Sequence, residues 1–217
     1  MFVVEGASLI AQAAAARWEI EAQYLAPGAE ALPLTGDVFE LGPNVIERVA
    51  STEAPQPVLA VVRQRASQLP SHPTFVLVGD RLADPGNAGT IIRSAEAAGA
   101  DAVVFTAGSV DVYNPKVVRA AAGSLFRLPV LSLELAALQS VGLAVLATSS
   151  HRGRSYTDVD LRQPVALVVG NEAHGVADDA AVAGWITIPH AGGAESLNVA
   201  MAATVIAFEV ARQRRQG

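Results

Sequence analysis

Short apolar segments alternate with helical patterns over the last two-thirds of the sequence, and this alternation constrains the fold more than any other feature. Strands are predicted at 75–78, 102–105, 128–131, 143–147, 165–169 and 185–189, and helices at 88–98, 115–122, 133–141, 177–183 and 196–212. Because the strand segments are apolar without interruption, they should be buried on both faces. The sequence therefore predicts an α/β fold with a parallel sheet covered by helices on both sides.

The first 66 residues are organised differently. Their predicted elements are a strand at 2–4, an Ala-rich helix at 7–21, a short helix within 38–49 and a strand at 57–62. Prolines and serines over 67–73 indicate a linker. We therefore expect a small α/β domain at 1–66 and a main domain at 74–217.

Composition limits the possible functions. Hydrophobic residues make up 51% of the chain, and there is no cysteine, which excludes disulfides and thiol catalysis. The histidines show no metal-ligand spacing, so we expect no metal site. The apolar runs are too short to span a bilayer, and we expect a cytoplasmic protein with no membrane contact. The net charge of −6 disfavours a generic nucleic-acid binder, although local basic patches are compatible with it.

Three polar, Gly-containing loops follow predicted strands, at 84–95, 168–175 and 188–200. In open α/β sheets, ligands bind at the carboxyl ends of the strands, so these loops are the candidate site. They lack G-x-G-x-x-G, G-K-[ST] and G-x-S-x-G, which disfavours dinucleotide, P-loop and serine-hydrolase functions.

Each polar residue of these loops also has a purely structural interpretation. Asn87 is compatible with a helix cap and Arg93 with a solvated cation. Glu172 is either a cap or a functional carboxylate. Ser196 and Asn198 stand at the start of the last predicted helix, where either can cap it.

In this order, the three loops resemble the signature motifs of the SpoU (TrmH-type) RNA ribose 2′-O-methyltransferases, which belong to the SPOUT class. The first motif is matched by Asn87 and Arg93, the second by Gly170 and Glu172, and the third by Ser196-Leu197-Asn198. The stretch 113–129 is also similar, and the resemblance extends over about 75–212. The segment 2–6 resembles the start of the ribosomal-protein-like, RNA-binding amino-terminal domain of many members, although the basic helix that usually precedes it is not present.

The resemblance implies a main domain with a carboxyl-terminal trefoil knot, an exception to ordinary connection rules. It also implies a homodimer with an active site shared across the interface, and S-adenosylmethionine as cofactor. The cofactor-binding residues implied are Thr148, Gly170, Asn171, Ile188, His190 and Leu197. Implied RNA contacts are Lys116 and Arg119. The family usually has Met where this chain has His190, which makes the pocket wall polar and titratable.

The implied reaction is in-line attack of a ribose 2′-hydroxyl on the sulfonium methyl group. Arg93 has too high a pKa to act as a base, so we expect it to position the substrate phosphate and hydroxyl. We expect Asn87 to hold Arg93 or the attacking group. The remaining motif residues, Glu172, Ser196 and Asn198, should frame the site.

The leading prediction is therefore a ribosomal RNA 2′-O-methyltransferase, with transfer RNA as the second choice of substrate. A non-catalytic RNA-binding or assembly factor that retained the fold is the alternative, and the acidic net charge favours it mildly. A nicotinamide oxidoreductase is disfavoured by the missing glycine fingerprint. The sequence does not identify the target nucleotide.

Overall fold

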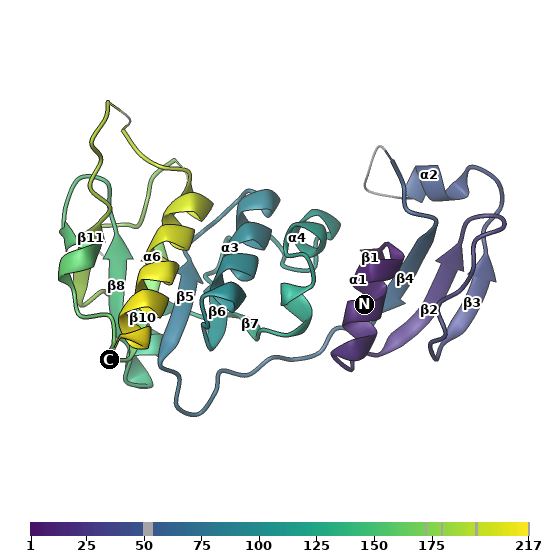
Figure 1. The fold of residues 1–217 in the computed structure, drawn as a ribbon, viewed down its shortest axis with the longest axis horizontal. Helices are drawn as coiled ribbons and strands as arrows, with labels where there is room; N and C mark the ends of the chain where they lie inside the picture. Colours follow the sequence, from purple (N-terminus) through teal and green to yellow (C-terminus); the bar gives the residue numbers. More distant parts are fainter. Residues whose placement is uncertain (50–53, 172, 179, 194, 217) are drawn as a thin grey trace.

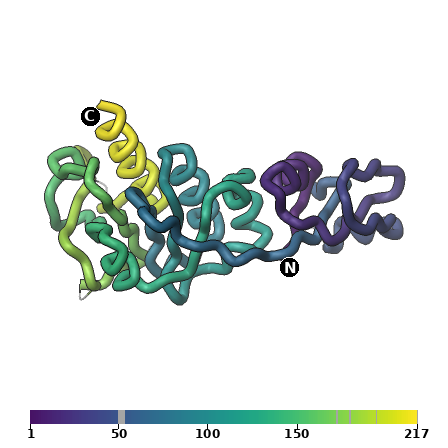
Figure 2. The backbone as a smooth tube through the Cα atoms, turned by 90° about the horizontal axis from the view of Figure 1, so that it is seen from below, coloured from purple at the N-terminus to yellow at the C-terminus, as the bar shows by residue number. Residues whose placement is uncertain are grey.

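The computed structural model describes residues 1–49, 54–171, 173–178, 180–193 and 195–216. Its strands form two sheets, a four-stranded one in the order β1-β4-β2-β3 and a seven-stranded one in the order β7-β6-β5-β10-β8-β11-β9. The sheets lie toward opposite ends of an elongated molecule (Figure 1). The segment 63–74, which has no helix or strand, runs along one edge between them (Figure 2).

The amino-terminal unit contains more strand than the sequence predicted. Its elements are β1 (Phe2–Glu5), α1 (Ala7–Ala15), β2 (Ile20–Leu25), β3 (Asp37–Glu40), α2 (Val45–Val49) and β4 (Val58–Val62). The helix predicted over 7–21 was wrong beyond Ala15, because Arg17 adopts a left-handed conformation (φ 60°) that ends the helix. The following residues form β2, which pairs with β4. Tertiary pairing thus overrides the Ala-rich local preference.

The main sheet is parallel throughout its paired strands, as predicted. The strands and α-helices of the main domain are β5 (Phe75–Gly79), α3 (Pro85–Ala97), β6 (Ala102–Phe105), α4 (Pro115–Ala120), β7 (Val130–Ser132), α5 (Leu135–Ser140), β8 (Ala144–Thr148), β9 (Arg154–Ser155), β10 (Val165–Val169), β11 (Gly184–Thr187) and α6 (Val199–Arg215). Two short 3-10 helices, η1 (Ser124–Phe126) and η2 (Tyr156–Asp158), complete it. The trefoil knot stays a prediction, because strand order and register do not determine how the connecting loops thread past one another.

The helix predicted at 177–183 was wrong, since the described residues of that stretch form none. The Ala183 N–H donates to the Val145 carbonyl at 2.7 Å, so this segment already runs alongside β8 before it enters β11. The pairing removes the backbone groups that a helix would use.

Side-chain caps set the helix starts. The Asp84 carboxylate accepts a hydrogen bond from the Asn87 N–H at 2.7 Å, and Pro85 occupies the first helical position, so α3 begins three residues earlier than predicted. The Asn198 side chain accepts from the N–H groups of Ala200 and Met201, so α6 begins at Val199 and not at Ser196.

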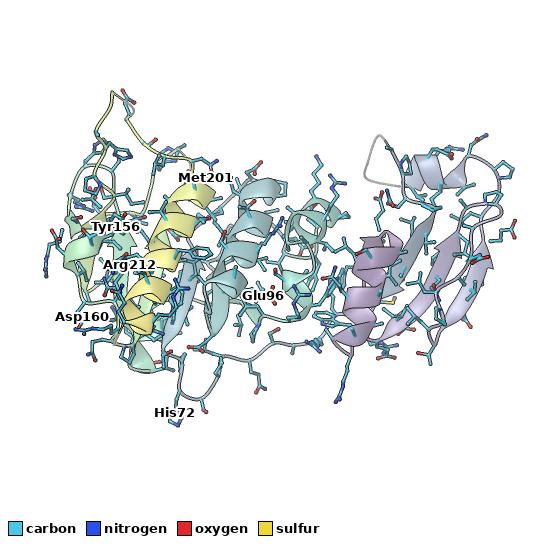
Figure 3. The ribbon with its side chains drawn as sticks, viewed as in Figure 1. His72, Glu96, Tyr156, Asp160, Met201 and Arg212 are labelled. Atoms are coloured by element: carbon cyan, nitrogen blue, oxygen red, sulfur yellow. The ribbon has the colours of Figure 1, made fainter. Side chains whose placement is uncertain are left out.

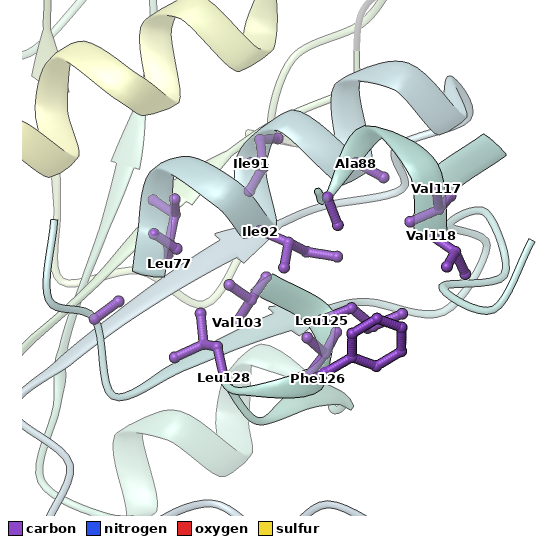
Figure 4. Packing of buried hydrophobic residues seen from close by; sticks show 14 of the residues in the cluster. Leu77, Ala88, Ile91, Ile92, Val103, Val117, Val118, Leu125, Phe126 and Leu128 are labelled. Carbon is purple, nitrogen blue, oxygen red and sulfur yellow. The ribbon is translucent and has the colours of Figure 1, made fainter. Parts of the chain in front are cut away.

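Alternate residues of the strands pack into two layers, as a pleated strand buried on both faces requires. Leu77 and Leu167 belong to the layer under α3, α4 and α6, whereas Val76 and Val168 belong to the layer that includes Leu138 of α5. Figure 4 shows the first layer between the sheet and the α3–α4 pair. The sheet is therefore covered on both sides, which confirms the prediction from the sequence.

The amino-terminal unit is held on the main domain by an aromatic junction. The Trp18 indole N–H donates to the Phe126 carbonyl at 2.9 Å. The Arg65 guanidinium lies 4.3 Å above the Trp18 ring and also donates to the Phe126 carbonyl. Phe2 packs edge-on against Trp18 and tilted against Tyr113. This buried contact orients the small sheet relative to the larger one.

Candidate active site

A cavity of about 680 Å³ lies at the carboxyl ends of β8, β10 and β11, beside the first turn of α6. Its size falls within the roughly 300–1,000 Å³ that small-molecule sites occupy. All six residues predicted to bind a cofactor line it: Thr148, Gly170, Asn171, Ile188, His190 and Leu197. Two of the predicted catalytic residues, Ser196 and Asn198, line it as well. The sheet therefore gathers the second and third loops around one space, as the sequence predicted.

Asn171 builds the turn that forms one wall of the cavity. Its side-chain oxygen accepts hydrogen bonds from the N–H groups of Ala173 and His174, and its side-chain nitrogen donates to the Arg81 carbonyl at 2.8 Å. The Gly175 N–H donates to the Asn171 carbonyl at 2.8 Å. Because the side-chain amide is engaged within the protein, Asn171 offers a ligand chiefly its main chain and the shape of the turn.

Gly170 permits this turn to fold back on β10. A Cβ placed on Gly170 would lie 2.1 Å from the Gly175 carbonyl carbon and 2.2 Å from the Val176 nitrogen. Both distances are far below van der Waals contact. The absence of a side chain at this position therefore allows the protein's own backbone to approach closely.

Asn87 and Asn198 meet across the α3–α6 interface. The Asn198 side-chain nitrogen donates to the Asn87 side-chain oxygen at 3.0 Å, although the two residues are 111 positions apart. A second contact, between the Ser94 and Thr204 hydroxyls at 2.7 Å, joins the same helices further along. The first and third loops are thereby linked by a direct hydrogen bond at the edge of the cavity.

Arg93 lies apart from this group. It does not line the cavity, its side chain is exposed, and it makes no hydrogen bond or ion pair with any residue that the structure describes. Six residues of helix separate it from Asn87, which corresponds to about 9 Å along the axis and a different face. The remaining predicted catalytic residue, Glu172, lies outside the described residues.

His190 brings an unsatisfied polar atom to the cavity. Its Nε2 is buried and has no hydrogen-bond partner among the described residues. Buried polar atoms are normally paired, so this nitrogen is suited to a ligand group. His151 and His174 line the same cavity, which the wide spacing of the histidines in the sequence could not show.

Sequence reasoning missed one cluster on the cavity wall. The Arg152 guanidinium lies 3.5 Å from the centre of the Trp185 ring and forms an ion pair with Asp178 at 2.5 Å. All three residues line the cavity. Local sequence patterns do not reveal this cluster, because Trp185 lies in a separate strand whose neighbours are known only from the sheet.

The predicted RNA contacts lie on α4, away from the cavity wall. Lys116 and Arg119 are both exposed. The Asn114 side chain accepts from the Lys116 N–H at 2.9 Å and so fixes the start of this helix. These cations stand on the part of the main domain that faces the amino-terminal unit, since α4 contacts β1.

An exposed apolar stripe runs along α6. Leu197, Met201, Val205 and Phe208 are large hydrophobic residues with exposed side chains at helical spacing. Figure 3 marks one end of this helix at Met201 and the other at Arg212. At the far end, Arg212 pairs with Glu209 at 2.7 Å, and this hydrogen bond holds the pKa of the Glu209 carboxyl below its ordinary value.

Two further classes of feature are absent from the part of the chain that the structure describes. It holds no group of three or more His, Asp or Glu side chains arranged to bind a metal ion. No helix in it has the length and apolar character needed to cross a membrane.

Comparison with known proteins gives a consistent result for both units. Residues 74–208 match the model of the SpoU rRNA Methylase family, and residues 1–60 match that of the MRM3-like substrate binding domain. The chain is 37% identical over 180 residues to the Bacillus subtilis 23S rRNA (guanosine(2553)-2′-O)-methyltransferase RlmP, covering 79% of this chain and 71% of that protein.

A second relative, the 23S rRNA (uridine(2479)-2′-O)-methyltransferase of Streptomyces viridochromogenes, is 37% identical over 194 residues, covering 80% of this chain and 66% of that protein. Among solved structures, the SpoU methyltransferase AviRb of Streptomyces viridochromogenes in complex with AdoMet superimposes with a TM-score of 0.88. That alignment has 31% identity and covers 100% of this chain and 91% of AviRb.

Proposed function

The chain belongs to the SpoU rRNA methylase family, and on that premise we propose that it transfers the methyl group of S-adenosylmethionine to a ribose 2′-hydroxyl of ribosomal RNA. One observation carries this proposal above the others. Gly170 of the second family motif and the three residues of the third, 196–198, line a single cavity, and the hydrogen bond from Asn198 to Asn87 joins the first motif to its edge.

The cavity suits S-adenosylmethionine in size and in chemistry. It offers apolar surface at Val169, Ile188 and Leu197 for an adenine ring, and a buried unpaired nitrogen at His190 for a polar atom of the ligand. The turn closed by the hydrogen bond from Gly175 to Asn171 forms one wall of the cavity against which the ligand would lie. Related structures bind this cofactor, which supports the same ligand here. When bound, it supplies an electrophilic sulfonium methyl group.

The protein's part in the reaction is mainly positioning. The hydrogen bond between Asn198 and Asn87 fixes the edge of the site where α3 and α6 meet, and so holds the two side chains beside the place where the attacking ribose would enter. Ser196 stands exposed beside this pair on the cavity wall. Together with Glu172, these side chains would orient the 2′-hydroxyl toward the methyl group.

Arg93 would supply the positive charge that orients the RNA. Its guanidinium remains protonated, so it serves as a charge-assisted donor to the phosphate and the hydroxyl and does not abstract the proton. The proton of the hydroxyl then leaves to the phosphate or to water.

A homodimer explains why Arg93 stands apart from the cavity of its own chain. Arg93 precedes Ser94, which contacts α6, so it lies beside the helix that carries the exposed apolar stripe. A contiguous apolar surface of this kind is typical of a subunit interface. A second copy packed on α6 would cover the stripe and bring Arg93 toward the partner's cavity.

Recognition of the RNA is assigned to the amino-terminal domain at 1–66, and catalysis to the domain at 74–217, with 67–73 as the linker. Lys116 and Arg119 would contact phosphates between the two. The match to a substrate binding domain and the names of the relatives favour ribosomal over transfer RNA. A ribosomal substrate also favours the cytoplasm as the compartment.

Calorimetric titration with S-adenosylmethionine, followed by mapping of 2′-O-methyl groups on ribosomal RNA, tests the proposal. We expect a Kd in the micromolar range, about −8 kcal/mol, and one new methylated ribose. Cofactor binding without methylation of ribosomal or transfer RNA would favour the non-catalytic alternative. Failure to bind the cofactor would overturn the proposal.

Arg93→Ala separates catalysis from binding. It should lower methyl transfer by at least about 100-fold and leave the Kd for S-adenosylmethionine within about twofold, because Arg93 does not line the cavity. Normal turnover by this variant would remove Arg93 from the mechanism.

Mixed dimers test whether Arg93 acts on the partner's site. An equal mixture of Arg93→Ala and Ser196→Ala chains should regain about a quarter of wild-type activity, since half the dimers would then hold one complete site. No recovery on mixing would place Arg93 in its own subunit's site.

A further inference from the structure

The wall of the cavity carries one permanent positive charge. Among its described lining residues, Arg152 is the only arginine or lysine, whereas Asp178 and Glu195 are the carboxylates. A ligand with an anionic group would therefore be attracted to Arg152 before any other residue of this wall.

The guanidinium of Arg152 is held in a defined orientation. It stacks on the Trp185 ring at 3.5 Å, and its Nη2 donates to Asp178 at 2.5 Å. Stacking leaves the N–H groups pointing outward in the plane of the guanidinium, where a carboxylate binds. Its Nε and Nη1 groups make no hydrogen bond with the described residues.

The ion pair with Asp178 leaves Arg152 able to bind a ligand. The Asp178 side chain is 91% exposed, so the ion pair is hydrated and weak. The stack on Trp185 nevertheless fixes the guanidinium, and a ligand that binds it need not order a mobile arginine.

We propose that Arg152 binds the carboxylate of the methionine moiety of S-adenosylmethionine, a proposal that rests on the proposed function. That carboxylate is the only anionic group of the cofactor. Each planar fork of a guanidinium pairs Nη2 with either Nε or Nη1, so one fork remains for a carboxylate beside the single hydrogen bond from Nη2 to Asp178. Trp185 acts as the platform that positions the guanidinium, and Asp178 accepts one hydrogen bond from it.

Three ligands test this assignment: S-adenosylmethionine, S-adenosylhomocysteine and 5′-methylthioadenosine. The last has the adenine, the ribose and a thioether but no carboxylate. Arg152→Gln should weaken the first two by about 10- to 100-fold and change the Kd of 5′-methylthioadenosine by no more than about twofold. Arg152→Lys, which keeps the charge but not the planar fork, should lose less affinity than Arg152→Gln.

Arg154→Gln is the matched control. Arg154 lies two residues further along the same segment, donates to the Asp158 carbonyl and does not line the cavity. This variant should bind all three ligands like the wild type.

The outcomes separate the alternatives. Equal weakening of all three ligands by Arg152→Gln would show that Arg152 only braces the cavity wall, and would overturn the proposal. Unchanged ligand affinities together with weaker RNA binding would make Arg152 a phosphate contact, and would also overturn it. If the wild-type protein bound none of the three ligands, the proposed function itself would fail.

Discussion

Replacement of Gly170 by alanine should disrupt the candidate site through a clash within the protein. The added Cβ would stand 2.1 Å from the Gly175 carbonyl carbon and 2.2 Å from the Val176 nitrogen, where ordinary contacts are 3.4–4 Å. Both obstacles are backbone atoms. The turn that contains them is tied down by the Asn171 side chain, so it cannot move aside freely.

The magnitude follows from this geometry. Relief of the clash requires a backbone shift of more than 1 Å, and overpacking of this kind costs about 1–3 kcal/mol. Because no flexible side chain can yield, we expect the upper end, about 3 kcal/mol, which lowers Tm by about 6–12 °C in a chain of this size. The displaced turn lines the cavity, so the affinity for S-adenosylmethionine should fall at least about tenfold.

Thermal unfolding and calorimetry of Gly170→Ala measure both effects. Gly192→Ala is the control, because a Cβ there meets no atom of the described residues within 4 Å, and its stability should stay within about 0.5 kcal/mol of the wild type. A wild-type Tm for Gly170→Ala would refute the clash. Loss of affinity at an unchanged Tm would mean that the glycine serves close approach of the cofactor and not of the turn.

Substitutions at two positions test the last helix. Asn198→Ala removes the cap of α6 and the hydrogen bond to Asn87, and should destabilise the protein by about 1–2 kcal/mol in urea unfolding. Asn198→Asp keeps the capping oxygen but cannot donate to Asn87, so this variant should retain near-normal stability and lose methyl transfer. If Asn198→Asp were as active as the wild type, the hydrogen bond to Asn87 would have no part in methyl transfer. The hydrogen bond from Arg212 lowers the pKa of the Glu209 carboxyl in the folded state. The charged carboxylate therefore stabilises the fold at any pH above its unfolded pKa of about 4.3. This stabilisation is lost as the pH falls through the lower, folded pKa. Glu209→Gln should therefore be less stable than the wild type at pH 7, and the two melting temperatures should converge toward pH 3; a constant difference across this range would contradict the ion-pair contribution.

Several features of the protein were predictable from short stretches of sequence. Uninterrupted apolar segments such as 165–169 predicted strands buried on both faces, because such a composition is stable only in a sheet covered on both sides. The glycine at position 99 predicted the end of α3, since it adopts a left-handed conformation (φ 80°) that glycine tolerates best. The residues that the family resemblance implied as cofactor contacts line the cavity, and their role in binding stays a prediction.

Other features depended on the tertiary structure. Residues 20–21 fell within the predicted helix but belong to β2, which is held as a strand by pairing with both β4 and β3. The contact of Asn87 with Asn198 and the stack of Arg152 on Trp185 join residues from separate elements, and their partners follow from the order of the strands and the packing of the helices. Local sequence encodes burial and capping, because these depend on neighbouring residues. Which distant side chains share a site is decided by non-local pairing and packing, and no local pattern carries that information.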